Sequence, residues 1–270
     1  MSAHEPDTED GDVDEDPRFP DSSPLSVIIK ADRFATTLEI LQSAAGESLL
    51  RFGRDGIDVR LVDPANVYML SLDVAPAAFE HVGEGQFPAG VNLDAWAEFI
   101  SKADSGDPIK LDFDAETRRV NVEYGPFDRS FALIGPDSIR REPDMPDLDL
   151  PNQMQLEASL LADVVAVSGM VSDHIEIEGD PDGECVRVIA DGDRDTNTAT
   201  LTDELQTADV REHASSILSI DYLEDIVGVM PASAVVTVRW GQEFPVVFEW
   251  EFVDGDASVT QTLAPRIQSQ

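Results

Sequence analysis

The groups in this 270-residue chain that could do chemistry are its 55 aspartates and glutamates, four histidines and one cysteine. Two neighbouring carboxylates, such as those of Asp191 and Asp193, could act as general acid and general base, which is the chemistry of a hydrolase. So many acidic residues produce such pairs by chance, however. The scattered histidines and Cys185 lack the spacing of a zinc site, and no phosphate-binding glycine motif or nucleophile elbow occurs. We therefore predict no catalytic residue, no metal ion and no cofactor, and we do not expect an enzyme.

The charge of the chain is strongly unbalanced. Its 55 acidic residues stand against 18 lysines and arginines, which gives a formal net charge of −37. One interpretation is a cytosol with molar salt, where screening limits the repulsion between carboxylates to very short range. The other is an acidic protein that mimics nucleic acid, which would concentrate its charge on one face. Because the acidic residues recur along the whole chain, the first interpretation is favoured.

The first 24 residues differ from the rest of the chain. They carry nine acidic residues against Arg18, with four prolines and few large apolar side chains, so residues 1–24 are predicted to form a disordered extension. They contain no apolar signal-peptide core, and no run in the chain approaches the length of a membrane span. The single cysteine permits no internal disulfide, which is typical of a reducing compartment. We expect a cytoplasmic protein with no membrane partner.

A proline-rich stretch at residues 135–153 lies near the middle of the remaining chain. Its four prolines exclude a helix or a central strand and indicate an extended linker. Met145, Leu148 and Leu150 alternate with aspartates in it. These apolar side chains either seal the linker onto its own two domains or form part of a site for a partner. The predicted divisions are residues 25–134 for the first domain, 135–152 for the linker and 153–270 for the second domain.

Hydrophobic periodicity predicts the same order of elements on both sides of the linker: a strand, a helix, several strands, a second helix and three strands. Asp32, Asn92 and Asp221 are the expected caps at the starts of three of the four helices. The strands are expected to pair as antiparallel sheets with one face covered. These patterns predict an α+β fold of two topologically similar domains, each with antiparallel sheet and two helices, so that four helices cover one side.

Four sequence blocks resemble a known family. They are residues 133–150 (LIGPDSIRREPDMPDLDL), 61–67 (LVDPANV), 170–175 (MVSDHI) and 263–267 (LAPRI). Together they resemble DNA sliding clamps of the proliferating-cell nuclear antigen (PCNA) type, most of all those of halophilic archaea or of viruses that infect them. The resemblance spans roughly residues 25–270. It implies the DNA clamp fold, assembled as a homotrimer in a closed ring that encircles duplex DNA without sequence specificity.

The resemblance also implies a site for client proteins, among them DNA polymerase, the clamp loader, flap endonuclease and ligase. In sliding clamps, a short PCNA-interacting peptide of the client occupies a groove formed by the linker, the loop after an early strand and the C-terminal tail. Apolar side chains from three segments would form a shallow pocket, and extended backbone would allow strand addition. The residues carried over are Val62, Asp63, Pro64, Ala65, Asn66, Val67, Met145, Pro146, Leu148, Leu150, Pro231, Ala264, Pro265, Arg266 and Ile267.

Ring closure would pair the last strand of the first domain with an edge strand of the second domain of the neighbouring copy. The alternative is that both are ordinary internal strands, and without a ring the protein would be an acidic DNA mimic or another acidic protein-interaction module. The expected subunit interface comprises Phe127, Arg129, Phe131, Leu133, Thr196, Thr198, Thr200 and Leu201. The DNA-facing basic residues are expected to be Lys30, Arg33 and Lys102, which are fewer than the family usually presents, so direct contact with phosphate should be weak.

Overall fold

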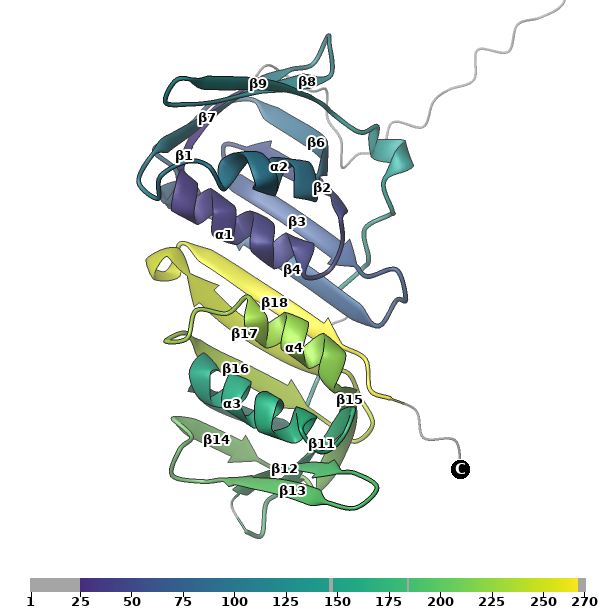
Figure 1. Ribbon diagram of the computed structural model, residues 1–270. Helices are drawn as coiled ribbons and strands as arrows, with labels where there is room; N and C mark the ends of the chain where they lie inside the picture. Colours follow the sequence, from purple (N-terminus) through teal and green to yellow (C-terminus); the bar gives the residue numbers. More distant parts are fainter. Residues whose placement is uncertain (1–24, 146–147, 184, 267–270) are drawn as a thin grey trace, which may run out of the picture.

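Each half of the chain folds in the order that the periodicity predicts (Figure 1). The computed structural model describes residues 25–145, 148–183 and 185–266, so the predicted extension at residues 1–24 lies outside the described residues. The helices are α1 (Ala31–Gln42), α2 (Leu93–Ile100), α3 (Ala158–Gly169) and α4 (Ile220–Gly228). Short 3-10 turns occur at η1 (Pro76–Ala78), η2 (Pro136–Ser138) and η3 (Val253–Gly255).

The helix caps were predicted correctly in one case of three. Asn92 caps α2, because its side chain accepts a hydrogen bond from the backbone N–H of Ala95. The predictions of Asp32 and Asp221 as caps were wrong. The cap positions of α1 and α4 are held by Lys30 and Ser219, neither of which makes a side-chain cap hydrogen bond. Asp32 and Asp221 instead lie in the first turn, where a carboxylate stabilises the helix dipole.

One antiparallel sheet runs through both halves of the chain. Strand β18 of the second half pairs with β4 of the first half along its whole length, from Leu263 opposite Tyr68 to Ala257 opposite Val74. The nine strands follow the order β14 (Thr207–Val210), β10 (Asn152–Glu157), β16 (Val235–Trp240), β17 (Val246–Phe252), β18 (Ala257–Leu263), β4 (Tyr68–Val74), β3 (Gly56–Val62), β2 (Glu47–Gly53) and β6 (Gln86–Asn92). Strand β10 begins at Asn152, a residue that the prediction assigned to the linker.

Two smaller antiparallel sheets lie at opposite ends of the molecule (Figure 1). The first belongs to the N-terminal half and has the order β5 (His81–Val82), β1 (Leu25–Lys30), β7 (Pro108–Asp114), β8 (Arg119–Tyr124) and β9 (Phe127–Ala132). The second belongs to the C-terminal half and has the order β13 (Thr196–Leu201), β12 (Cys185–Asp191), β11 (His174–Asp180) and β15 (Ala214–Ser219). The short strands β5 and β14 and the strand β6 were missing from the sequence prediction.

All four helices lie on one side of the sheets, as predicted (Figure 1). Their apolar faces and the inward faces of the strands form one hydrophobic core that continues through both halves. Phe34 of α1 and Trp96 of α2, for example, are buried with their rings 6.0 Å apart. The linker passes the other side of the nine-stranded sheet, so the helices and the linker occupy opposite faces. In the described part of the chain, no helix is both long enough and apolar enough to cross a membrane.

Candidate partner-binding sites

The loop between β3 and β4 is organised by the buried carboxylate of Asp63, which is 5% exposed. Its oxygens accept hydrogen bonds from the backbone N–H groups of Ala65, Val67 and Tyr68, at 2.9, 2.7 and 2.8 Å. Asn66 holds a left-handed backbone conformation in this turn, with φ of 59°. The carboxylate thus satisfies three backbone donors of a loop that makes few backbone bonds of its own, and this fixes the position of Val67 at the surface.

A fourth donor to Asp63 comes from the other half of the chain. The hydroxyl of Tyr222 in α4 donates to Asp63 Oδ2 at 2.9 Å. Burial raises the pKa of the Asp63 carboxyl, but the hydrogen bonds from Tyr68, Ala65, Val67 and Tyr222 stabilise the charged form and hold the pKa below its usual value of 3.8. Asp63 is therefore an anion at neutral pH that ties the β3–β4 loop to helix α4.

The C-terminal tail continues from β18 along this loop. Ala264 N–H donates to the carbonyl of Val67 at 2.9 Å, and Arg266 N–H donates to the carbonyl of Ile217 in β15 at 2.7 Å. The Arg266 guanidinium lies 3.3 Å from the carboxylate of Asp173. A hydrogen bond from His174 and the pairing with Arg266 hold the pKa of Asp173 below its usual value. The tail thus lies between the β3–β4 loop and the edge strand β15.

The linker is fastened to both halves. On the first half, Arg140 donates to the side chain of Asn66, and Glu142 is paired with Arg51 of β2. On the second half, the Arg239 guanidinium of β16 lies within 3.4 Å of the Leu148 carbonyl oxygen. The β3–β4 loop (residues 62–67), the linker residues 145 and 148–150 and the tail (264–266) are the described parts of the predicted peptide site, which we call the client groove. The loop and the tail are directly hydrogen-bonded to one another, and the linker is bonded to the loop through Arg140.

The residues of the predicted groove differ in their exposure. Val62 and Asp63 are buried supports, whereas Val67, Met145, Leu148, Leu150, Ala264 and Pro265 are half-buried, and Pro64, Ala65, Asn66 and Arg266 are exposed. Pro146 and Ile267 lie outside the described residues.

Pro231 does not belong to the client groove. It lines a hollow with Val253 and Asp254, at the turn between β17 and β18. That turn is the opposite end of the hairpin from Leu263 and the tail, so the inclusion of Pro231 was wrong. Pro245, which the sequence prediction missed, immediately precedes Val246, and Val246 pairs with Leu263. The antiparallel pairing expected for the last two strands could have placed Pro245 beside the tail.

The two strands expected at the subunit interface are edge strands. Strand β9 ends the five-stranded sheet and β13 ends the four-stranded sheet, at opposite ends of the molecule. The alternative that they are internal strands is therefore wrong for this chain. The expected interface residues differ in their exposure: Phe127, Arg129, Thr196, Thr198 and Thr200 are exposed, Leu133 is half-buried, and Phe131 and Leu201 are buried in the cores of their own sheets.

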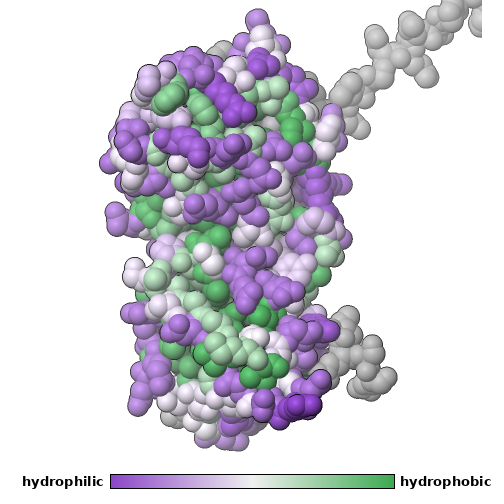
Figure 2. Space-filling view, viewed as in Figure 1, coloured by the Kyte–Doolittle hydropathy of each residue, from purple (hydrophilic) through white to green (hydrophobic). Residues whose placement is uncertain are grey.

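An apolar surface beside β13 was missed by the sequence prediction. Val167 of α3 is 47% exposed, and Met170, which immediately follows α3, is 81% exposed. Gly169 packs against Ile220 of α4. Residues two apart on a helix point about 200° from one another. Because Val167 lies two residues before Gly169, it faces away from α4. That direction leads to β12 and β13, against which α3 packs. Figure 2 shows the hydrophobic surface gathered over the half of the molecule that carries α3 and α4.

The exposed face of the four helices, which we call the helix face, carries more acidic than basic side chains. Lys102 follows α2 and is exposed. Arg33 of α1 is half-buried, and its guanidinium donates to the carbonyl of Ala78 at 2.6 Å. Lys30 is half-buried at the end of β1. The exposed acidic residues of these helices are Asp32, Glu39, Asp94, Glu98, Asp163, Asp221, Glu224 and Asp225.

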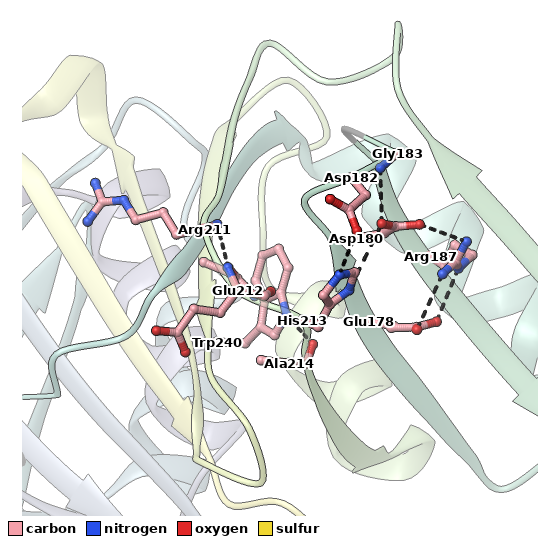
Figure 3. A network of polar contacts seen from close by, with 11 residues as sticks. Glu178, Asp180, Asp182, Gly183, Arg187, Arg211, Glu212, His213, Ala214 and Trp240 are labelled. Carbon is pink, nitrogen blue, oxygen red and sulfur yellow. Dashed lines mark hydrogen bonds and ion pairs between the residues drawn. The ribbon is translucent and has the colours of Figure 1, made fainter.

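Asp180, Asp182 and His213 converge at the end of the β11–β12 hairpin (Figure 3). One ligand atom of each residue lies within 4.8 Å of the others, and such an arrangement could hold a metal ion. The sequence prediction did not anticipate this cluster, because His213 is 31 residues from Asp182. Each group already has a partner: His213 contacts Asp182 at 3.2 Å, and Asp180 contacts Arg187 at 3.2 Å and accepts from Gly183 N–H at 3.0 Å. We interpret the cluster as a polar bridge between the hairpin and the segment before β15.

Comparisons with known proteins place the whole described chain in one family. No protein-family model matches the chain. The chain is 40% identical over 245 residues to a DNA polymerase sliding clamp of Natronomonas pharaonis, and this alignment covers 91% of this chain and 99% of the relative. It is 38% identical over 246 residues to a DNA polymerase sliding clamp of Haloarcula marismortui, and this alignment covers 91% of this chain and 100% of the relative. Among solved structures, PCNA of A. fulgidus bound to the C-terminal region of FEN-1 is 29% identical with a TM-score of 0.85, and the match covers 91% of this chain and all of the A. fulgidus chain.

The chain belongs to the DNA polymerase sliding clamp family. The resemblance that the four sequence blocks indicated is thereby confirmed, including its similarity to clamps of halophilic archaea. The DNA clamp fold is confirmed as well, since the sheets and four helices match those of PCNA. These relatives are named as clamps rather than as enzymes, in agreement with the expectation that this clamp is not an enzyme.

The first testable prediction concerns the buried carboxylate of this clamp. Asp63→Asn should lower the free energy of unfolding at pH 7 by about 1–3 kcal/mol, because an amide cannot accept four hydrogen bonds as an anion does. The folded-state pKa of Asp63 lies below the unfolded value near 3.8, so its contribution is present above that pH and is lost as the pH falls through the folded-state pKa. Chemical denaturation in molar KCl at pH 7 and pH 3 measures the difference between variant and wild type, which should shrink at pH 3.

The control for this experiment is Asp137→Asn, which changes an exposed aspartate in η2. It should leave the free energy of unfolding within about 0.5 kcal/mol of wild type at pH 7. If Asp63→Asn and Asp137→Asn behave alike at pH 7, the convergence of donors on Asp63 does not stabilise the loop.

Proposed function

We propose that three copies of this chain close into a ring that encircles duplex DNA and slides along it. The observation that carries the proposal is the pair of edge strands, β9 and β13, at opposite ends of a body that is held together by one continuous sheet. Pairing β9 of one copy with β13 of the next is a heterologous contact that repeats until the rotation closes. It would also satisfy two rows of backbone groups that would otherwise promote aggregation.

Side chains support the same pairing. Phe127 on β9 is 54% exposed and Val167 beside β13 is 47% exposed. In a head-to-tail arrangement both large apolar side chains would lie in the contact between copies, where their burial stabilises the ring. The exposed hydroxyls of Thr196, Thr198 and Thr200 line the other face of β13. Ring closure would place the helix face toward the hole in every copy.

Contact with DNA would depend on the ring more than on ion pairs. The exposed acidic residues of the helix face repel phosphate, and Lys102 is the exposed member of the three predicted DNA-facing cations, since Lys30 and Arg33 are half-buried. Solvent cations at molar concentration can reduce this repulsion, since the Debye length falls to about 3 Å at 1 M salt. A closed ring remains threaded on DNA without tight binding.

The client groove would tether other replication proteins. PCNA of A. fulgidus is seen with the C-terminal region of FEN-1, and the same type of peptide from a flap endonuclease, a DNA polymerase, a ligase or the clamp loader would occupy residues 62–67, 145–150 and 264–266 here. The proposed site of action is the cytoplasm, where the DNA of an archaeal cell lies.

The second prediction tests the ring. Val167→Glu should place a charge in the contact between copies and weaken self-association by about tenfold or more, because burying an unpaired carboxylate costs several kcal/mol. Val235→Glu is the matched control, since Val235 is 43% exposed on β16, away from both edges. Sedimentation in molar KCl should show a trimer for wild type and the control and smaller species for Val167→Glu. A monomeric wild-type protein would contradict the ring.

The third prediction tests encirclement. A clamp loaded on nicked circular DNA in molar KCl should stay on the circle and should leave rapidly once the DNA is linearised, because only topology holds it. Short linear duplex should bind weakly and with a shallow dependence on salt, since each phosphate neutralised by a cation contributes about −0.9 to the slope of log K against log salt. Tight binding to short linear duplex that is lost in Lys102→Ala would show that direct charge contacts dominate instead.

The fourth prediction tests the client groove. Leu148→Ala should weaken binding of a synthetic peptide that copies the C-terminal region of A. fulgidus FEN-1 by about 1–3 kcal/mol, the usual effect of truncating an apolar contact at the centre of a binding site. Fluorescence anisotropy of the labelled peptide measures the change, and Val235→Ala serves as the control with unchanged affinity. Equal affinity in Leu148→Ala and wild type would place the peptide site elsewhere.

A further inference from the structure

The polar bridge of Asp180, Asp182 and His213 contains the kinds of ligand that transition metals prefer. Asp180 ends β11, Asp182 lies in the turn that leads to β12, and His213 immediately precedes β15. Although the chain has 55 acidic residues, these three form the only group in the described part of the chain that could hold a metal ion. The imidazole distinguishes the group from the oxygen-only ligand sets that suit Mg²⁺ and Ca²⁺.

The strand register brings Asp180 and His213 together. Gly179 of β11 pairs with Ala214 of β15 at the end of their ladder, so the next residue on each side, Asp180 and His213, lie opposite one another. His213 Nδ1 is 4.0 Å from Asp180 Oδ1, and His213 Nε2 is 3.2 Å from Asp182 Oδ2. Both ring nitrogens therefore face carboxylates. One of them can bind an ion while an N–H on the other donates to a carboxylate, as is usual for metal-bound histidine.

The carboxylate of Asp180 is held in a fixed orientation, and its side chain is 17% exposed. The backbone N–H of Gly183 donates to its Oδ1 at 3.0 Å, and a Cβ placed on Gly183 would lie 2.9 Å from its Oδ2, so a side chain at that position would displace the carboxylate. Arg187 lies 3.2 Å from the same Oδ2 and is itself bound to Glu178 through two hydrogen bonds of 3.1 and 3.3 Å. Asp180 therefore needs no ordering when an ion binds.

The backbone on both sides of His213 is fixed by buried side chains. Asn152 is 0% exposed, and it accepts a hydrogen bond from the N–H of Glu212 at 3.1 Å and donates to the carbonyl of Glu212 at 2.9 Å. The indole N–H of Trp240 donates to the carbonyl of Ala214 at 3.3 Å (Figure 3). The imidazole thus starts from an anchored backbone, while its exposed side chain is free to rotate.

The distances and the charge both suit a divalent ion. Zinc binds nitrogen and carboxylate oxygen at about 2.0–2.2 Å, which separates tetrahedral ligand atoms by about 3.3–3.6 Å. The ligand atoms here lie within 4.8 Å of one another, and the exposed side chains of Asp182 and His213 can close the difference by small rotations. Asp180, Asp182 and Glu178 are three carboxylates against the single guanidinium of Arg187, which leaves two negative charges for an ion to neutralise.

We propose that Asp180, Asp182 and His213 bind one divalent transition-metal ion per chain, with water completing its coordination. Zinc is the ion that we take as the probe, because imidazole and carboxylate are both among its usual ligands. The ion would join the β11–β12 turn to the segment before β15 and so stabilise one end of the four-stranded sheet. A single chain carries all three ligands, so the inference does not depend on the proposed ring or on the client groove.

The first test is calorimetric titration of Zn²⁺ into metal-free protein, in molar KCl with excess Mg²⁺. Salt and Mg²⁺ suppress non-specific binding of cations to the many carboxylates. Wild type should bind one Zn²⁺ per chain, and His213→Asn and Asp182→Asn should each weaken binding by about tenfold or more, because each removes a ligand. The matched controls are His81→Asn, at an exposed histidine of β5, and Asp193→Asn, at an exposed aspartate between β12 and β13. Both should bind like wild type.

The second test is chemical denaturation with and without Zn²⁺. An ion that binds only the folded chain raises the denaturation midpoint, so Zn²⁺ should raise it for wild type and for both controls and should have little effect on His213→Asn and Asp182→Asn. With a chelator present, all five proteins should have similar midpoints. The side chain of Asp182 is 91% exposed, so Asp182→Asn provides a variant whose loss of zinc binding is not a loss of folding.

Three results would overturn the metal site: no Zn²⁺ bound to wild type, equal affinity in wild type and His213→Asn, or equal weakening by His81→Asn and His213→Asn. The last would mean that Zn²⁺ binds the chain non-specifically. Failure of the ring is a separate result. If the wild-type protein sediments as a monomer and still binds one Zn²⁺ through His213, the ring is wrong and the metal site stands.

Discussion

The pairing of β18 with β4 is the interaction on which the other features of this clamp depend. It joins the two halves of the chain as neighbours in one antiparallel sheet, with Leu263 opposite Tyr68 at one end and Ala257 opposite Val74 at the other. Because the register is fixed over the full length of both strands, the tail leaves β18 beside the β3–β4 loop, and Ala264 can bond to Val67. The same pairing keeps all four helices on one side and leaves β9 and β13 at opposite ends. A slip of one residue would reverse the faces and bury the polar side chains.

The sequence was sufficient to predict the architecture because its strongest signals are periodic. The repeated order of strands and helices follows from which side chains are apolar, and both helices and long strands need that pattern to form the core. The misses have a different origin. Strands β5 and β14 are two and four residues long, which is too short for a pattern to emerge, and they are held by pairing with neighbours distant in sequence. Asp32 and Asp221 failed as caps because α1 and α4 begin at Ala31 and Ile220, one residue before each aspartate.

The binding sites were predictable only in part, because a surface site depends on which segments become neighbours. The motif around Asp63 identified its loop, whereas Pro231 and Pro245 could be told apart only by the register of β17 and β18. Val167 is not on the buried face of α3, and the sequence does not show that its exposed side chain lies in an apolar surface. Sequence patterns report burial well and exposure poorly, and binding requires exposure.

Charge is distributed so that the arginines stabilise the sheets and leave the helix face acidic. Arg187 pairs with Glu178 across β11 and β12, and Arg239 pairs with Glu249 across β16 and β17. Each exposed cross-strand ion pair of this kind contributes little to the stability of the fold. The arginines in these pairs are nevertheless engaged by carboxylates and are less available to bind phosphate. Arg33, although on α1, is bound to a backbone carbonyl. The helix face therefore offers few cations to phosphate, and in the proposed ring it is closure that would keep the clamp on DNA.

The hydrogen bond between Asp63 and Tyr222 joins the β3–β4 loop to the helices. A single buried carboxylate, that of Asp63, is bonded both to backbone N–H groups of Ala65, Val67 and Tyr68 and to the hydroxyl of Tyr222 in α4. The rings of Tyr68 and Tyr222 are in edge contact, and the Tyr68 hydroxyl accepts a hydrogen bond from the buried Gln261 of β18. Each donor and acceptor in this chain of contacts has a partner, so the loop has no alternative arrangement that would keep its polar groups satisfied. The β3–β4 loop is consequently held in place, and in the proposed client groove it would need no ordering when a peptide binds.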